Sequence, residues 1–312
     1  MRILLHAPLH ISFWIYLMES MPEHQWFIEP NDNFEGGTIP HNHIKYQVVP
    51  SEFNENFDVQ IICLQLGSDK LRFLKLFPVP VVWLEYWRCA VPEIPIKYPL
   101  ISTSYSDSNS EYPNIRYSHI TPSPTLWNID WIGDQPTVFI SARRFSKLTV
   151  IAPILNQLKK KVTNLDVIEE TPRTIPFEEW RNKFIHNRVL LDLSLKKGDM
   201  VLQEAMKIGM PVITFNKFDY PLVIRDKIDG FSSWNPENLK SEKELNELIE
   251  LLNKFSIDYS FAKEWGERAK ARAKECFPIE KQREIWNKAF EDAISLHQES
   301  LKKRKQDLEV KK

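Results

Sequence analysis

Glycine is scarce in this sequence, which has 8 glycines and 21 prolines among its 312 residues. A loop that brings its backbone close to a phosphate or a sugar usually needs glycine, because a Cβ atom would hold the ligand away. Few loops of this chain can therefore approach a ligand through glycine. The glycines in candidate loops are Gly36, Gly37 and Gly198.

Cysteine is also rare, and its positions argue against two kinds of small stabilised domain. The three cysteines, Cys63, Cys89 and Cys276, are far apart and form no Cys-x-x-Cys pair. We therefore expect neither a disulfide framework nor a zinc site. We expect a reducing, cytoplasmic location.

Long apolar runs and an excess of one charge are absent too. No run approaches the ~18 apolar residues of a membrane-spanning helix. His6, Pro8 and His10 interrupt the apolar N-terminal stretch, so we expect a first strand and helix there rather than a signal peptide. The formal net charge of -1 gives no general argument for nucleic acid as a partner.

The composition that remains is that of a globular protein, with 43% hydrophobic and 27% charged residues. The length indicates about two domains. The segment 121–136 contains Pro122, Pro124 and Pro136 and is predicted to be a linker between them. Short apolar runs alternate with helical spacing, which predicts an α/β fold with parallel sheets covered on both faces. The predicted strands are 2–7, 25–28, 44–49, 58–64, 79–84, 100–102, 137–141 and 165–168. The predicted helices are 11–20, 69–77, 147–161, 176–184, 242–255, 259–276 and 279–301.

One segment carries more information than the rest of the chain. The apolar run 188–193 is followed by a loop with one glycine, a helix of about ten residues, and the strand 211–215. Gly209 stands where the helix needs a left-handed residue, and Pro211 prevents its continuation. Ala205 and Gly209, four apart, leave one helix face nearly bare, so it can lie close on a sheet. The helix N-terminus favours a phosphate, and Glu204 is placed to accept hydrogen bonds from ribose hydroxyls.

The sequence Glu204-Ala-Met-x-x-Gly-x-Pro-Val-Ile resembles the nucleotide-sugar site of the retaining glycosyltransferases of family 4. The match extends from about Arg188 to Phe231 and ends in Ile228-Asp-Gly-Phe. The resemblance implies a GT-B fold: two Rossmann-like domains facing a cleft, with a C-terminal helix that crosses back to the N-terminal domain. It predicts an acceptor domain at 1–130, a nucleotide-sugar donor domain at 131–277, and a C-terminal helix with a basic tail at 278–312. The helix would dock through Trp286 and Phe290, and a helix packed on its own domain is the alternative.

A basic cluster follows the predicted strand 137–141. Arg143, Arg144 and Lys147 offer two guanidinium groups and an ammonium that could neutralise a diphosphate. The family carries a basic pair here that contacts the donor pyrophosphate, although the spacing in this chain differs by one or two residues. The resemblance therefore assigns the catalytic set to Arg143, Arg144, Lys147 and Glu204. A solvated basic turn is the alternative.

The loop before Glu204 departs from the family pattern. Eight residues before this glutamate the family usually has another Glu, and this chain has Lys196. Asp199 could substitute in part, or could simply favour the helix N-terminus. Gly198 could let the backbone approach the ligand. The predicted donor-binding residues are Ser194, Lys196, Gly198, Asp199 and Met200.

Acceptor-side residues are expected near the end of the first predicted strand, because ligands of such sheets lie at the carboxyl ends of strands. His6, His10 and Trp14 could line an acceptor pocket, and Gly36-Gly37 resembles the mobile glycine loop of the acceptor domain. The alternatives are buried histidines beside a core aromatic and a plain surface loop.

The resemblance implies transfer of a hexose from a nucleotide diphosphate sugar to an acceptor hydroxyl, with retention of configuration and without a cofactor or bound metal. The expected partners are the nucleotide sugar and a glycan, lipid or protein acceptor. The basic tail, 302–305 and 311–312, adds a hypothesis of peripheral membrane contact, against that of a solvated end. Two other functions stay open: a GT-B nucleotide-sugar epimerase, and a non-catalytic protein that binds nucleotide sugar or glycan.

Overall fold

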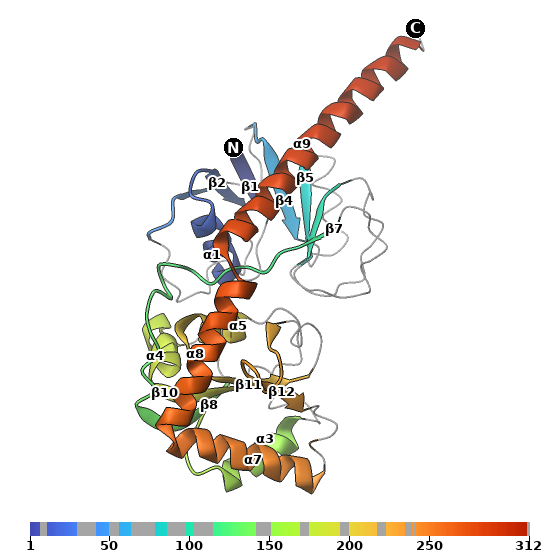
Figure 1. Cartoon of the computed structure of the whole chain (residues 1–312). Coiled ribbons are helices and arrows are strands. Elements are labelled where there is room, and N and C mark those ends of the chain that lie inside the picture. Colours follow the sequence, from blue (N-terminus) through green and yellow to red (C-terminus); the bar gives the residue numbers. More distant parts are fainter. Residues whose placement is uncertain are drawn as a thin grey trace. The chain divides into compact units, whose positions relative to one another are not determined.

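The computed structural model divides the chain into two compact units, which are described separately. Unit 1 comprises Met1–Gly36, His41–Ile120 and Ile279–Lys312, and unit 2 comprises Gly37–Pro40 and Thr121–Pro278. The structure describes residues 1–6, 11–29, 42–49, 56–63, 79–85, 98–102, 115–141, 151–168, 175–193, 200–216, 223–234, 239 and 241–310. Figure 1 labels the elements.

Unit 1 contains a parallel sheet of seven strands in the order β3-β2-β1-β4-β5-β6-β7. Six of these strands are predicted from the sequence. The seventh, β7, is not, because it is a short edge strand whose three residues are all partly exposed. The strands are β1 (Arg2–His6), β2 (Gln25–Glu29), β3 (Tyr46–Val48), β4 (Val59–Cys63), β5 (Val81–Glu85), β6 (Leu100–Ser102) and β7 (Ile115–Tyr117).

Two helices of unit 1 come from distant parts of the chain. α1 (Ile11–Ser20) has the predicted bounds, and α9 (Ile279–Val310) contacts α1 and strands β4, β5 and β6. Trp286 and Phe290 on α9 are fully buried, and the His24 ring lies edge-on to Phe290 at 5.9 Å between centroids. Gln282 Nε2 also donates to Ser20 Oγ at 2.7 Å. The predicted return of the C-terminal helix to the N-terminal sheet is therefore confirmed.

Unit 2 contains a parallel sheet of five strands in the order β12-β11-β10-β8-β9. Its strands are β8 (Gln135–Ser141), β9 (Leu165–Ile168), β10 (Asn187–Asp192), β11 (Val212–Phe215) and β12 (Phe231–Trp234). Its helices are α3 (Ile151–Lys161), α4 (Phe177–His186), α5 (Met200–Ile208), α7 (Glu242–Ile257) and α8 (Tyr259–Cys276).

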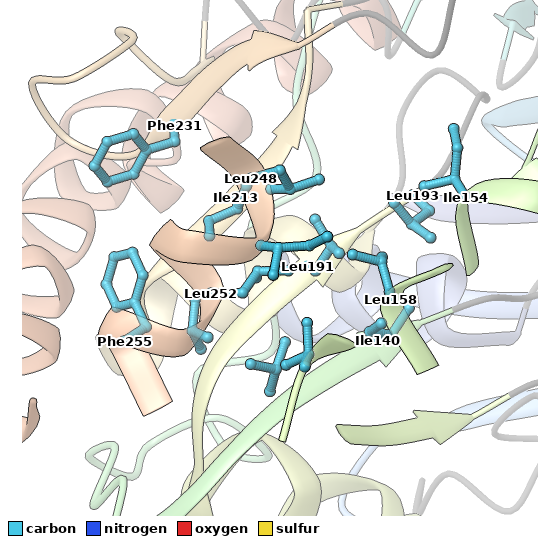
Figure 2. Packing of buried hydrophobic residues seen from close by; sticks show 14 of the residues in the cluster. Ile140, Ile154, Leu158, Leu191, Leu193, Ile213, Phe231, Leu248, Leu252 and Phe255 are labelled. Atoms are coloured by element: carbon cyan, nitrogen blue, oxygen red, sulfur yellow. The ribbon is translucent and has the colours of Figure 1, made fainter. Parts of the chain in front are cut away.

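The core of unit 2 lies on both faces of this sheet. On one face, strand residues such as Ile140, Leu191 and Ile213 form a cluster with apolar residues of α3 and α7 (Figure 2). The preceding residue of β8, Phe139, points to the opposite face and contacts Trp180 and Phe184 of α4. Helices therefore cover both faces, as expected for a parallel sheet.

The segment 121–136, predicted as a linker, packs instead on unit 2. Trp127 is 1% exposed and lies edge-on to Phe177 and Phe184 of α4. Trp131 Nε1 donates to the carbonyl of Asn187 at 2.7 Å. The prolines of this segment disfavour regular secondary structure. The segment is nevertheless held on unit 2, because Trp127 is buried and Trp131 is partly buried against the core cluster.

Helices α5 and α8 approach so closely that their contact requires glycine. A Cβ atom on Gly266 of α8 would lie 2.2 Å from the carbonyl oxygen of Gly209, just beyond α5. The bare face predicted at Gly209 thus packs against a helix rather than against the sheet. Because the obstacle is backbone, neither side can move away cheaply.

We predict that Gly266→Ala destabilises the protein by about 2 kcal/mol, through overpacking against the Gly209 carbonyl. At an ordinary helix position the same change would be stabilising by up to about 1 kcal/mol. Urea unfolding measures the difference. The control is Ala271→Gly on the exposed face of α8, which reports helix propensity alone. A Gly266→Ala protein as stable as the unsubstituted one would contradict the close contact.

The junction of β7 with α9 contains a histidine that is held neutral. Burial, and secondly the positive charge of Lys281 on α9, lower the pKa of His119 from 6.5 to about 4. The unfolded chain therefore takes up a proton at a higher pH than the folded protein does. The stability contributed by neutral His119 is complete above pH 6.5 and is lost as the pH falls toward 4.

We expect the free energy of unfolding to fall by about 2 kcal/mol between pH 7 and pH 5 on account of His119. Urea titrations at the two pH values, with His119→Gln for comparison, isolate this contribution. His24→Gln is a control at another histidine of unit 1. If the His119→Gln protein lost as much stability as the unsubstituted protein over this range, His119 would not be the titrating group.

Candidate functional site

The unit 2 sheet has a topological switch point between β8 and β10. The chain leaves β8 toward β9 on one side and returns to β10 on the other, so connections diverge where these two strands pair. Ligands of open α/β sheets bind at the carboxyl ends of strands at such a point. Ser141, Asp192 and Thr214 lie in register there, at or near the ends of β8, β10 and β11. They form a polar row across the sheet.

The predicted phosphate and donor loops begin at this row. The basic cluster follows β8, and the donor loop follows β10 and leads into α5. Because β8 and β10 are paired neighbours, the two loops start from adjacent strand ends. The residues themselves lie outside the described part of the chain: Arg143, Arg144, Lys147, Ser194, Lys196, Gly198 and Asp199.

Helix α5 has the end predicted for it. Gly209 adopts φ +92°. Its N–H donates to the carbonyl of Met206 at 3.2 Å, and the N–H of Met210 donates to the carbonyl of Ala205 at 2.9 Å. These two bonds form a Schellman motif, which stops the helix and turns the chain into β11. Met200, predicted to bind donor, is the first residue of α5 and is buried.

Glu204 is buried, with 5% of its surface exposed, one turn into α5. Its neighbour Gln203 is 7% exposed, and within the described residues its Oε1 accepts no hydrogen bond. Apolar residues occupy most other positions of this helix. A buried carboxylate and a buried amide at neighbouring positions of a largely apolar helix mark this part of α5 as a candidate binding site.

The sequence reasoning missed Asp192. Its carboxylate is fully buried at the end of β10, and its backbone carbonyl accepts a hydrogen bond from Thr214 Oγ1 at 3.3 Å. The signal was present in the sequence, since an aspartate that closes an apolar strand is unusual in a buried sheet. Without the strand register, nothing placed it between Ser141 and Thr214.

The predicted Asp-Gly-Phe turn is a rigid loop before β12. Asp229, 1% exposed, accepts from the backbone N–H of Arg225 at 2.7 Å and from its guanidinium Nε at 2.5 Å. Asp226 in turn accepts from the N–H of Ser232 and from Ser233 Oγ. A Cβ atom on Gly230 would meet Ile224 at 2.9 Å. These contacts fix the strand end next to β11.

In unit 1, the switch point lies between β1 and β4, and His6 stands at the end of β1. Its Nδ1 lies 2.6 Å from Glu29 Oε2 and its Nε2 lies 2.8 Å from Gln60 Oε1. Gln60 Nε2 donates to the carbonyl of Val79, so the amide oxygen faces the ring. His6 is thus held by side chains of the two strands that pair with β1.

The predicted acceptor-side residues are not exposed where the structure describes them. His6 is 0% exposed because both ring nitrogens are bonded within the sheet, and Trp14 is 2% exposed against Phe13. As described, neither ring is open to an acceptor. His10, Gly36 and Gly37 lie outside the described residues. In the described ranges no group of three His, Cys, Asp or Glu side chains could hold a metal ion.

No family model and no curated protein matches this chain. Solved structures do match this chain. Sucrose-phosphate synthase from Thermosynechococcus elongatus is 12% identical with a TM-score of 0.65, over 95% of this chain and 100% of that one. HepE from Anabaena, solved in complex with UDP-glucose, is 11% identical with a TM-score of 0.61, over 92% and 99%.

TarM shows the same likeness over part of its length. It is 12% identical with a TM-score of 0.53 over 74% of this chain, which spans only 54% of TarM. At these identities the likeness concerns the fold. Together with the two parallel sheets and the return of α9, it identifies the architecture of this chain as the GT-B fold.

Proposed function

We propose that this protein is a glycosyltransferase that moves a hexose from a nucleotide diphosphate sugar to an acceptor hydroxyl. The observation that carries the proposal is the buried Glu204 on α5, the helix that follows the strand end at the unit 2 switch point. A carboxylate there can accept hydrogen bonds from both ribose hydroxyls and so fix the register of the nucleotide.

The diphosphate must be stabilised as it leaves. The bond between the sugar C1 and the phosphate oxygen breaks, and the bond between C1 and the acceptor oxygen forms. Arg143, Arg144 and Lys147 would neutralise the diphosphate, aided by the α5 N-terminus and donor-loop residues such as Gly198. The acceptor proton passes to the leaving phosphate on the same face of the sugar. This route gives retention and requires neither a strong side-chain base nor a bound metal.

The nucleotide is the first property to establish. HepE was solved with UDP-glucose, which makes uridine nucleotides the first to try. A thermal-shift screen of UDP, GDP, ADP and their sugar conjugates would select the ligand, because a hundredfold excess over Kd stabilises the folded state by about 2.7 kcal/mol. The acceptor, a glycan, lipid or protein hydroxyl, can then be sought with the correct donor.

We predict that Glu204→Gln weakens binding of the selected nucleotide sugar by about ten- to a hundredfold, because charge-assisted hydrogen bonds to the ribose are lost. Isothermal titration calorimetry measures the change, and release of nucleoside diphosphate should fall in parallel. Glu29→Gln is the matched control, since it alters an equally buried glutamate in unit 1. Unchanged affinity and turnover for Glu204→Gln would remove this residue from the site.

We further predict that Arg144→Ala lowers nucleotide affinity about tenfold and makes it less sensitive to salt, because a cation that faces the diphosphate is removed. Titrations at low and high ionic strength test this. Arg268→Ala on the exposed surface of α8 removes the same charge elsewhere in unit 2. Equal effects of the two substitutions would exclude a specific role for Arg144.

One observation favours a second function. Lys196 replaces the carboxylate that the family uses to hold the donor sugar, and a protein with this change could bind nucleotide sugar without transferring it. The two functions differ in one measurement. Binding of nucleotide sugar without release of nucleoside diphosphate, with water or any acceptor, would favour the non-catalytic protein.

A further inference from the structure

Helix α9 continues well past the part that packs on unit 1. Its last buried residue is Ala293, and residues 301–309 are all exposed. Figure 1 shows the final turns of α9 extending away from the strands of unit 1. We call residues 294–310 the α9 extension. Between Ile294 and Ser300 the extension is partly buried, and from Leu301 to Glu309 it presents its side chains to the surroundings.

The α9 extension combines a basic run with exposed leucines on one face. Leu301 is 42% exposed and Leu308 is 64% exposed. They are seven residues, or two turns, apart and so lie on the same face. Arg304 and Lys305 stand three or four residues from both leucines and therefore flank them. Four consecutive basic residues, 302–305, outnumber the three acidic residues of the α9 extension, Glu299, Asp307 and Glu309.

The basic side chains are available for an external partner. Within the described part of the chain, none of the four basic residues at 302–305 forms an ion pair. An ion pair on α9 lies earlier in the helix, where Lys288 Nζ is 3.1 Å from Asp292 Oδ1. The chain as a whole is close to neutral, with a formal net charge of -1, so the positive charge of this segment is a local feature.

We propose that the α9 extension binds the surface of a lipid bilayer that contains anionic phospholipid. The leucine face would enter the boundary between headgroups and acyl chains, and the flanking cations would contact lipid phosphates and carboxylates. No helix in the described ranges has the length and hydrophobicity to cross a bilayer. The contact is therefore peripheral. It is independent of the proposed catalytic activity.

A second copy of this chain fits the α9 extension less well. A helix pair needs apolar residues at both alternating seam positions, three or four residues apart. Between Leu301 and Leu308 those positions hold Arg304 and Lys305. In a parallel pair of helices, each of these cations would face the same residue of the other chain, and like charges at a buried seam repel. An anionic lipid surface instead can bury the leucines and bind the cations at the same time.

The test uses the full chain and vesicles of phosphatidylcholine, with or without about one third phosphatidylserine. Co-sedimentation measures the partition coefficient. Each basic residue near an anionic surface raises this coefficient by about fivefold. We expect binding to the phosphatidylserine vesicles alone, and we expect it to weaken in high salt, which shortens the range of the attraction. Absence of binding to phosphatidylserine vesicles would overturn the proposal.

Matched variants locate the contact. The quadruple variant K302Q/K303Q/R304Q/K305Q should lower the partition coefficient at least about tenfold. K160Q/K243Q/K263Q/K274Q removes four exposed charges from unit 2 and should leave most of the binding. Circular dichroism checks that the helices persist. Equal losses in the two variants would mean that net charge, and not the α9 extension, attracts the protein.

The leucine face has its own test. The variant L301Q/L308Q keeps every charge and should reduce binding to phosphatidylserine vesicles severalfold, because less apolar surface is buried. Light scattering without lipid is the complementary measurement. A dimer that this variant converts to a monomer would show that the leucines serve self-association, and that result would overturn the membrane assignment.

Discussion

The parallel pairing of β10 with β8 on one side and β11 on the other is the constraint on which the candidate site depends. This register places Ser141, Asp192 and Thr214 in one row. It also requires the loops after β8 and β10 to start from adjacent strand ends. In the function that we propose, this pairing is what would let the basic cluster and Glu204, about sixty residues apart in the chain, serve one ligand. A shift in register would separate them.

Three of the described glycines have clear roles in backbone conformation and close packing. Of the described glycines, Gly209 ends α5 in a left-handed conformation, and Gly266 lets α8 meet that end. Gly230 allows the turn before β12 to lie against Ile224. At these positions a larger residue would be strained or would clash with its neighbours.

Helix α9 has two parts with different physical characters. Up to Ala293 it buries Trp286 and Phe290 and belongs to the core of unit 1. Its last turns, residues 301–309, are exposed and carry four basic residues and two leucines. A single helix thus joins a stable domain to a surface suited to a charged interface. The rigidity of its buried part fixes the direction in which the exposed part leaves the domain.

Periodicity and local chemistry predicted much of the fold. The bounds of α1, α8 and β9 agree with prediction, and the end of α5 at Gly209 follows from glycine and proline chemistry alone. Local patterns failed where long-range contacts decide. β7 forms only because β6 offers it hydrogen bonds, and the proline-rich segment before β8 packs on unit 2 through Trp127. His6 matched an acceptor-pocket pattern, yet its partners Glu29 and Gln60 come from other strands.

The sequence by itself determined the α/β class, the alternation of strands and helices, and the local form of the Glu204 helix, because these depend on residues a few positions apart. Only the tertiary structure decided that Asp192 joins the polar row, that Gly209 meets Gly266, and that the fully exposed part of α9 begins at Leu301. Those outcomes depend on which distant surfaces pack together. The free energy of such packing is shared among many residues, and no short stretch of sequence contains it.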